Sequence, residues 1–243
     1  MATLTMAEAA QQQIDLILAR ANTKRVHYKF PDVSLGRASD ILFAKYEYQC
    51  ALRNRLVENP DEVRRTCDKV ARWLTDLSTR PWLAILGKMG TGKTVLMRAI
   101  GSSLISLRGE LTKGLDYMDK LKLMEKRGGN AWGDSYFVSA IDLATLATDP
   151  DRRYTYTEHI LGNKQEHYLL IDDVGQDPVE FKSYGNAFIP FVEIINKRYD
   201  AQYPVIITSN LSLSEIGNRY GERIADRFKE MAEQITFTGK SYR

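Results

Sequence analysis

Two stretches of the sequence carry residues whose types and spacing fit a chemical reaction. The first is GKMGTGKT, residues 87–94, which matches G-x-x-x-x-G-K-[ST] at every fixed position. Glycines let such a loop bend until its backbone N–H groups converge on phosphate oxygens, and the lysine and hydroxyl reach the outer phosphates and magnesium. The stretch therefore predicts a nucleotide site, with binding residues Gly87, Lys88, Met89, Gly90, Thr91, Gly92, Lys93, Thr94 and Val95.

The second stretch is LLIDDVG, residues 169–175, in which two acids follow an apolar run. In P-loop ATPases a second strand ends in an Asp that helps to hold magnesium. We therefore predict that Thr94 and Asp172 hold Mg²⁺ and that Asp173 is the general base or orients the attacking water. The alternative for both acids is a solvated turn that ends a strand.

The expected nucleotide is ATP. A guanine-specific site requires a loop of the type N-K-x-D, and the nearest candidate is NKRY, residues 196–199. Its last position is a Tyr where an acid is required, and Asp200 comes one position late. This stretch is better interpreted as the solvated face of an amphipathic helix.

The fold expected around these residues is α/β. Short apolar runs predict strands at residues 82–86, 136–140, 168–171 and 204–209, and helices are expected near 92–108, 141–148, 184–199 and 212–229. Strands that are apolar on both faces and alternate with helices indicate a mostly parallel sheet covered on both sides, a three-layer P-loop sandwich. The stretch 109–135 is interpreted as an insertion.

A helical region is expected before this domain. Apolar residues recur at helical spacing near residues 14–21, 41–52 and 63–77, and the third helix is expected to begin at Pro60 with Asn59 as its cap. We predict a helical N-terminal region at residues 1–58, a possible partner-binding module, and an ATPase domain at residues 59–243.

Composition excludes several classes of protein. The chain has 243 residues, of which 44% are hydrophobic and 27% charged, and its net charge of +3 is too small to indicate nucleic-acid binding by itself. Two Cys and three His lack metal-ligand spacing, so we expect no zinc site and buried thiols. Without a signal peptide or a long apolar run, the protein is expected to be cytoplasmic, with no membrane partner.

The motifs in order resemble the AAA+ ATPases of the bacterial DnaC/IstB-like helicase-loader family. The resemblance covers roughly residues 60–243 and consists of GKMGTGKT, LLIDDVG, TSNL, YGERIADRF and the closing SYR. It implies a sensor-1 role for Asn210, an arginine finger at Arg227 or alternatively Arg223, and a sensor-2 role for Arg243. Because such a finger acts on a neighbouring subunit's ATP, it also implies a homo-oligomer assembled with ATP.

Many AAA+ proteins have Glu at the position of Asp173, whereas the loader branch frequently has Asp. The shorter side chain holds its carboxylate about 1.5 Å further back, by ordinary bond lengths. Asp173 therefore supports either full turnover through an adjusted backbone or only slow, switch-like hydrolysis.

Three functions remain open at this point. The first is a replicative-helicase loader that binds single-stranded or duplex DNA, the second an ATPase helper of a transposase, and the third an ATP-binding scaffold with vestigial hydrolysis. Candidate DNA contacts combine basic residues with aromatic ones. They are Lys120, Lys122, Lys126 and Arg127, and separately Arg152 and Arg153 with Tyr154 and Tyr156, and each group is alternatively a solvated surface.

Overall fold

The computed structural model describes residues 11, 28–126, 135–149, 151, 168–178, 181–183 and 186–237. The predicted first helix, the patch at residues 152–156, Arg127 and Arg243 lie outside the described residues. The elements, in chain order, are α2 (Leu35–Ala51), α3 (Pro60–Thr75), β1 (Trp82–Gly87), α4 (Lys93–Thr112), α5 (Tyr117–Lys126), β2 (Ser135–Ser139), α6 (Ala140–Thr148), β3 (Tyr168–Val174), β4 (Phe181–Ser183), β5 (Asn186–Phe188), α8 (Pro190–Ala201), β6 (Val205–Ser209), α9 (Leu213–Tyr220), α10 (Glu222–Met231) and β7 (Ala232–Phe237).

A parallel sheet forms the centre of the molecule, as the apolar runs predict. The five strands of this sheet pair in the order β2-β3-β6-β1-β7, and each of these pairs is parallel. Strand β6, late in the chain, lies between β1 and β3. Because carboxyl ends of parallel strands share one edge of a sheet, this order brings the ends of β1, β3 and β6 together.

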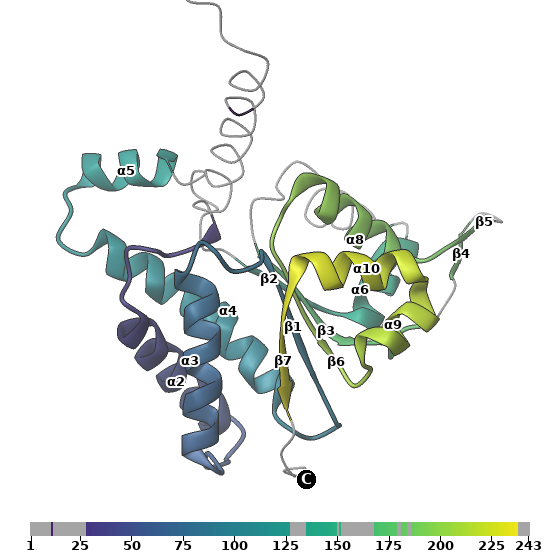
Figure 1. The fold of residues 1–243 in the computed structure, drawn as a ribbon, viewed down its shortest axis with the longest axis horizontal. Coiled ribbons are helices and arrows are strands. Elements are labelled where there is room, and N and C mark those ends of the chain that lie inside the picture. The colour runs from purple at the N-terminus through teal and green to yellow at the C-terminus, as the bar shows by residue number, and fades with distance from the viewer. Residues whose placement is uncertain are drawn as a thin grey trace, which may run out of the picture.

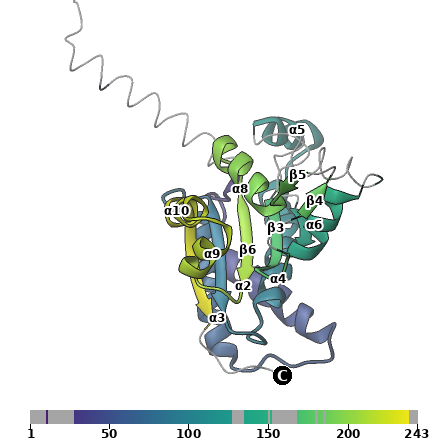
Figure 2. The same ribbon diagram turned by 90° about the vertical axis from the view of Figure 1, so that its right-hand side faces the viewer.

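Helices cover both faces of the sheet, which explains why its strands are apolar on both sides (Figures 1 and 2). Along β1, Leu83 and Ile85 belong to the core under α2, α3 and α4, whereas Trp82 and Ala84 belong to the core under α6, α8, α9 and α10. This alternation follows from the two-residue period of a strand. The three-layer α/β fold predicted from the sequence is therefore confirmed.

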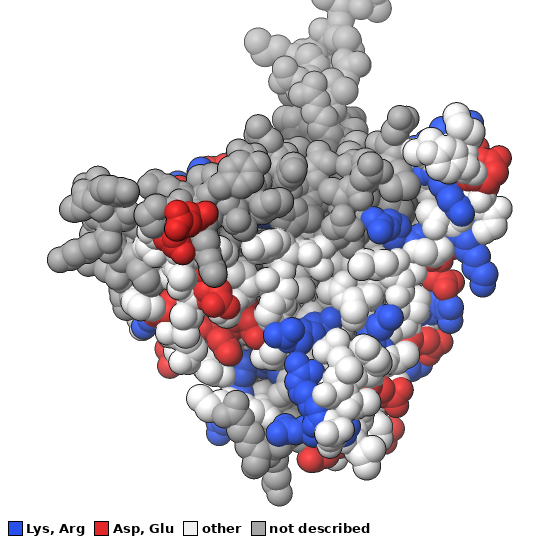
Figure 3. Space-filling model, turned by 180° about the vertical axis from the view of Figure 1, so that it is seen from behind, with Lys and Arg blue, Asp and Glu red and all other residues white. Residues whose placement is uncertain are grey.

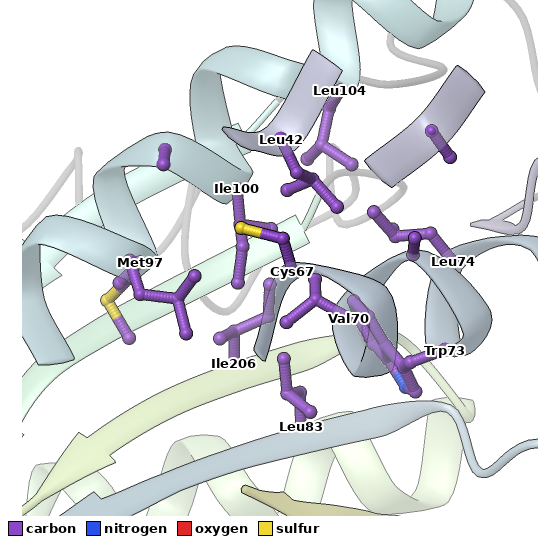
Figure 4. Packing of buried hydrophobic residues seen from close by; sticks show 14 of the residues in the cluster. Leu42, Cys67, Val70, Trp73, Leu74, Leu83, Met97, Ile100, Leu104 and Ile206 are labelled. Carbon is purple, nitrogen blue, oxygen red and sulfur yellow. The ribbon is translucent and has the colours of Figure 1, made fainter. Parts of the chain in front are cut away.

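Residues 28–58 share a hydrophobic core with α3, α4 and the sheet. Figure 4 shows Cys67 of α3 close to Leu42 of α2 and Ile100 of α4, and all three are fully buried in one core cluster. The boundary drawn from the sequence, between residues 58 and 59, falls in the exposed connection between α2 and α3, two helices that share this core. The role of residues 1–58 as a partner-binding module stays a prediction.

Several local expectations differ from the structure. The expected helix at 212–229 is two helices, because Gly221 at φ 102° ends α9 before α10 begins. Asn59 has left-handed backbone (φ 51°) and makes no side-chain cap, so the capping prediction was wrong, although Pro60 does begin α3. Strand β7 was not predicted, and the short antiparallel pair β4–β5 precedes α8.

The described residues also bear on two expected absences. None of the helices in the described ranges is long and apolar enough to cross a membrane. The same residues contain no cluster of three potential metal ligands among His, Cys, Asp and Glu. Cys50 and Cys67 are free thiols in the interior, and burial raises the pKa of Cys67 to about 12, so it behaves as a small apolar residue.

Candidate nucleotide site

The loop at residues 87–94 joins β1 directly to α4, at the carboxyl edge of the sheet. Gly92 immediately precedes the helix and has a positive φ of 94°, which a glycine adopts without steric cost. Thr91 is buried, and its hydroxyl donates to the Lys88 carbonyl at 2.9 Å, which closes the loop on itself. The loop leads directly into α4, whose first backbone N–H groups have no partner within the helix and are therefore suited to bind an anion.

Gly87 begins this loop because there is no room for a side chain. Its φ is 149°, and a Cβ atom at this position would lie 2.6 Å from the carbonyl oxygen of Phe237 in β7. The glycine therefore lets the end of β1 approach the neighbouring strand closely enough for the loop to turn.

Lys93 connects the loop to the end of β6. Its ammonium donates to the carbonyl oxygens of Gly87 and Lys88, both at 2.8 Å, and to Oδ1 of Asn210 at 2.7 Å. Burial lowers the pKa of Lys93, and the nearby carboxylates of Asp173 and Asp172 oppose that change. The cation predicted to contact phosphates and the polar residue predicted as sensor 1 are thus in direct contact.

Thr94 and Asp172 also lie together, as the sequence predicts for a magnesium site. The Thr94 hydroxyl donates to Oδ1 of Asp172 at 3.1 Å, and Asp172 is 6% exposed. Hydroxyl and carboxylate oxygens are the protein ligands that Mg²⁺ takes beside nucleotide phosphates. The donor set present at this point fits the metal that the P-loop implies.

Asp173 is exposed, whereas Asp172 is buried. Its backbone is left-handed, with φ of 55°, and its N–H donates to the hydroxyl of Thr208 at 2.8 Å. The two consecutive acids therefore differ in environment: Asp172 accepts a hydrogen bond from Thr94, and Asp173 lines the cavity.

A cavity of about 630 Å³ lies over the loop and is large enough for a nucleotide. Its walls come from four parts of the chain. They are the α2–α3 connection (Arg53, Arg55, Leu56, Val57 and Glu58, beside Tyr46 and Cys50), the phosphate loop (residues 89–95), the β2–α6 junction (Ser139, Ala140 and Ile141), and the strand ends with Asp173, Gln176 and Asn210.

Comparison with solved structures identifies the fold. No family model matches the sequence, and no curated protein matches it. The DnaC helicase loader has a TM-score of 0.46 and 20% identity, over 72% of this chain and 89% of that one. AMPPCP-bound DnaA from Aquifex aeolicus has a TM-score of 0.46 and 23% identity, over 76% of this chain and 48% of that one. DnaI has a TM-score of 0.51 and 18% identity, over 77% of this chain and 88% of that one.

The chain has an AAA+ fold. The DnaI structure shares this fold at a TM-score of 0.51. In this chain the P-loop joins β1 to α4. Within this AAA+ fold, the phosphate loop, both acids and Asn210 all lie at one edge of the sheet.

The arginines expected at the neighbouring subunit's site lie elsewhere in the AAA+ fold. Arg227 is 5% exposed on α10, where its guanidinium donates to Oδ1 of Asn196, lies 3.7 Å from Oδ1 of Asp200 and stacks over the Tyr199 ring at 4.3 Å. Arg223, in the first turn of the same helix, is exposed. Neither residue lines the cavity.

Sequence reasoning missed the part of the cavity wall that comes from the α2–α3 connection. Leu56 is 91% exposed although it is apolar, and it lines the cavity beside Arg53 and Arg55. The only signal in the sequence is an apolar residue in a short polar stretch between two helices, which does not point to a nucleotide. Thr208 was also missed, because a Thr in an apolar strand has no distinctive pattern.

A second cluster fixes the loop that follows the two acids. The N–H of Gly175 donates to the Tyr220 hydroxyl at 3.0 Å and lies 3.2 Å from Oδ1 of Asp177. The Tyr220 hydroxyl donates in turn to Asp177, which is 3% exposed, and Arg219 donates to the Asp177 carbonyl. The end of α9 is thereby attached to the segment that carries Asp173 and Gln176.

Proposed function

We propose that the protein is a magnesium-dependent ATPase. The observation that carries this proposal is a pair of hydrogen bonds beside one cavity. Lys93 bonds Asn210 at 2.7 Å, and Thr94 bonds the buried Asp172 at 3.1 Å. Lys93, Thr94 and Asn210 line the cavity. These residues come from three adjacent strand ends and no local feature of the sequence brings them together. The AAA+ fold supports the same proposal.

Each residue has a distinct task in hydrolysis. Lys93 and the first N–H groups of α4 bind the β- and γ-phosphates. Thr94 and Asp172 would hold Mg²⁺, which would offset negative charge on those phosphates. The oxygen of the attacking water forms a bond to the γ-phosphorus, and the bond between the γ-phosphorus and the β–γ bridging oxygen breaks. Asp173 accepts the proton that this water loses. Asn210 orients that water. The products are ADP and inorganic phosphate.

The structure supports ATP rather than GTP as the substrate. Residues 196–199, the nearest approach to a guanine-specific loop, lie within α8, and none of them lines the cavity. Arg198 of that stretch is 1% exposed. A loop that recognises guanine would have to line the cavity and face the bound base.

We further infer that this ATPase works as a DnaC-like helicase loader in DNA replication. The support is the AAA+ fold shared with DnaI, together with the order of motifs in the sequence. A single subunit lacks a cation from a neighbour, and a supplied arginine finger typically raises the rate about 10³–10⁵-fold. Hydrolysis is therefore slow until subunits assemble. The exposed Arg223 is placed better than the buried Arg227 to reach a second subunit.

DNA contact is part of this proposal. Figure 3 shows Lys and Arg side chains gathered low on one face of the molecule, where they offer neutralising charge to phosphates. Of the basic run noted in the sequence, Lys122 is exposed on α5 and pairs with Asp119 at 3.4 Å. Surface pairs of this kind are weak, so Lys122 is available to a phosphate.

The test is the rate of ATP hydrolysis against protein concentration, with and without single-stranded DNA and Mg²⁺. A rate that rises faster than linearly, requires Mg²⁺ and responds to DNA supports the proposal. A rate that stays near zero at every concentration, with tight ATP binding, identifies an ATP-binding scaffold instead. The matched control is Lys93→Ala, which should abolish ATP binding.

A second experiment identifies the partner. Because residues 28–58 share a core with α3 and α4, the bait must be the full chain with ATP rather than its N-terminal region alone. Direct binding to a purified replicative helicase supports the loader function. Binding to a transposase and not to the helicase contradicts it and identifies an ATPase helper of transposition.

A further inference from the structure

The ladder between β3 and β6 is interrupted at the two acids. Ile171 pairs with Ile207 and Val174 pairs with Ser209, so two residues of β3 lie opposite the single residue Thr208. This two-to-one arrangement is a β-bulge, which bends the strand and redirects its side chains. Without the bulge, strict alternation would send the Asp172 and Asp173 side chains to opposite faces of the sheet.

The hydroxyl of Thr208 occupies the bulge. It accepts a hydrogen bond from the Asp173 N–H at 2.8 Å and donates one to Oδ1 of Asp172 at 2.5 Å. Thr208 is completely buried, so water does not substitute for its hydroxyl. One side chain thus satisfies the amide that the bulge removes from the ladder and also orients the neighbouring carboxylate.

The backbone at Asp173 requires such support. A non-glycine residue at φ of 55° is in a sparsely populated conformation that persists only when its surroundings hold it. The hydrogen bond from Asp173 N–H to Thr208 is a contact that holds this conformation. Its consequence is that Asp172 stays buried beside Thr94 while Asp173 lines the cavity.

We propose that Thr208 is the positioning residue of the site, which sets the orientation of both acids through its single hydroxyl. Thr208 does not line the cavity, so it acts through Asp172 and Asp173 and not on the nucleotide. The expected effect of Thr208 on hydrolysis rests on the proposed ATPase activity, whereas its role in orienting the two acids does not.

The test compares Thr208→Val, which keeps the shape and removes the hydroxyl, with Thr208→Ser, which keeps the hydroxyl. The control is Ser103→Ala, which removes another fully buried hydroxyl, bonded to the Ala99 carbonyl inside α4. The readouts on the full chain are amide hydrogen exchange at Asp173 by NMR, the Mg²⁺ concentration giving half-maximal rate, and kcat and KM for ATP.

In Thr208→Val we expect amide exchange at Asp173 to accelerate and the Mg²⁺ concentration for half-maximal rate to rise. We expect kcat to fall about 10–100-fold, the usual effect of losing a supporting contact at a metal site, and KM for ATP to change little. Thr208→Ser and Ser103→Ala should behave as the wild type does. A Thr208→Ser variant as impaired as Thr208→Val would overturn the proposal, because the methyl group and not the hydroxyl would then matter. Unchanged exchange and unchanged kcat in Thr208→Val would also overturn it.

The outcomes separate this inference from the proposed function. If the wild-type protein binds ATP but never hydrolyses it, the ATPase proposal fails. Thr208 is then judged by exchange at Asp173 and by the Mg²⁺ dependence of ATP binding. Faster exchange with a higher Mg²⁺ requirement in Thr208→Val alone supports the positioning role, and the absence of both contradicts it.

Discussion

Lys93 donates a 2.7 Å hydrogen bond to Asn210, which joins the phosphate loop after β1 to the end of β6 across 117 positions of the sequence. The same ammonium is held by two carbonyl oxygens of its own loop. Under the proposed function, Lys93 would exchange some of these contacts for phosphate oxygens when ATP binds. We therefore predict that the hydrogen bonding of Asn210 depends on the presence of the γ-phosphate.

This coupling predicts a separation of binding from turnover in Asn210→Ala. ATP should bind at least as tightly as to the wild type, because Lys93 no longer has to leave Asn210. Turnover should fall about 10–100-fold, since the attacking water loses a group that orients it. Calorimetry of ATP binding and steady-state hydrolysis check the two parts, and a large loss of ATP affinity would contradict the assignment.

The two acids should respond differently to the loss of one charge. Asp172→Asn should raise the Mg²⁺ concentration required for activity, because Asp172 contacts Thr94 at the expected metal position. Asp173→Asn should leave Mg²⁺-dependent ATP binding intact and lower turnover about 10²–10⁴-fold, so that bound ATP is trapped. Titration with Mg²⁺ and quantification of bound nucleotide distinguish the variants. Equal effects of the two substitutions in both measurements would show that the two acids do not have separate roles.

The two arginines of α10 should also separate. Arg227→Ala removes a buried guanidinium that contacts Asn196, Asp200 and Tyr199, so its free energy of unfolding should fall by about 1–3 kcal/mol. Arg223→Ala should leave stability and ATP binding unchanged and abolish the rise in specific activity with protein concentration. Denaturant unfolding and concentration-dependent hydrolysis provide the two measurements. Loss of that rise only in Arg227→Ala would assign the finger to Arg227.

Tyr220 should give the protein a measurable sensitivity to alkaline pH. Burial, with the hydrogen bond to Asp177 as the second cause, raises the pKa of Tyr220 above the ordinary tyrosine value of about 10. Because the folded pKa is higher than the unfolded one, the stabilisation is complete below pH 10 and is lost as pH rises above that value.

Tyr220→Phe should therefore cost about 1–3 kcal/mol at pH 7, the usual cost of leaving a buried polar partner unsatisfied. The difference from the wild type should shrink above pH 10, and denaturant unfolding at pH 7 and above pH 10 measures it. The control is Tyr48→Phe, which removes a hydroxyl from a side chain that is 56% exposed and should have no effect. A difference that does not change with pH would contradict the role of this hydroxyl.

Local chemistry in the sequence determined the phosphate loop, the two acids and the alternation of strands and helices. Each of these depends on neighbouring residues: glycines that permit a tight loop, an apolar run that ends in carboxylates, and helices that cover both faces of a sheet. Strand β7 escaped prediction because its buried residues, Ala232 and Ile235, alternate with polar ones too irregularly for a strand pattern. As an edge strand it needs little apolar surface.

Only the tertiary structure decided which of these features meet. The order β3-β6-β1 brings Asn210 to Lys93 and Thr208 to the two acids, and strand order depends on long-range packing rather than on local propensity. The same packing brings the α2–α3 connection to the cavity and buries Arg227 against α8. Motifs along the chain therefore indicate which groups could react, whereas the folded sheet sets the distances between them. Side chains far apart in sequence approach one another only where their strands pair.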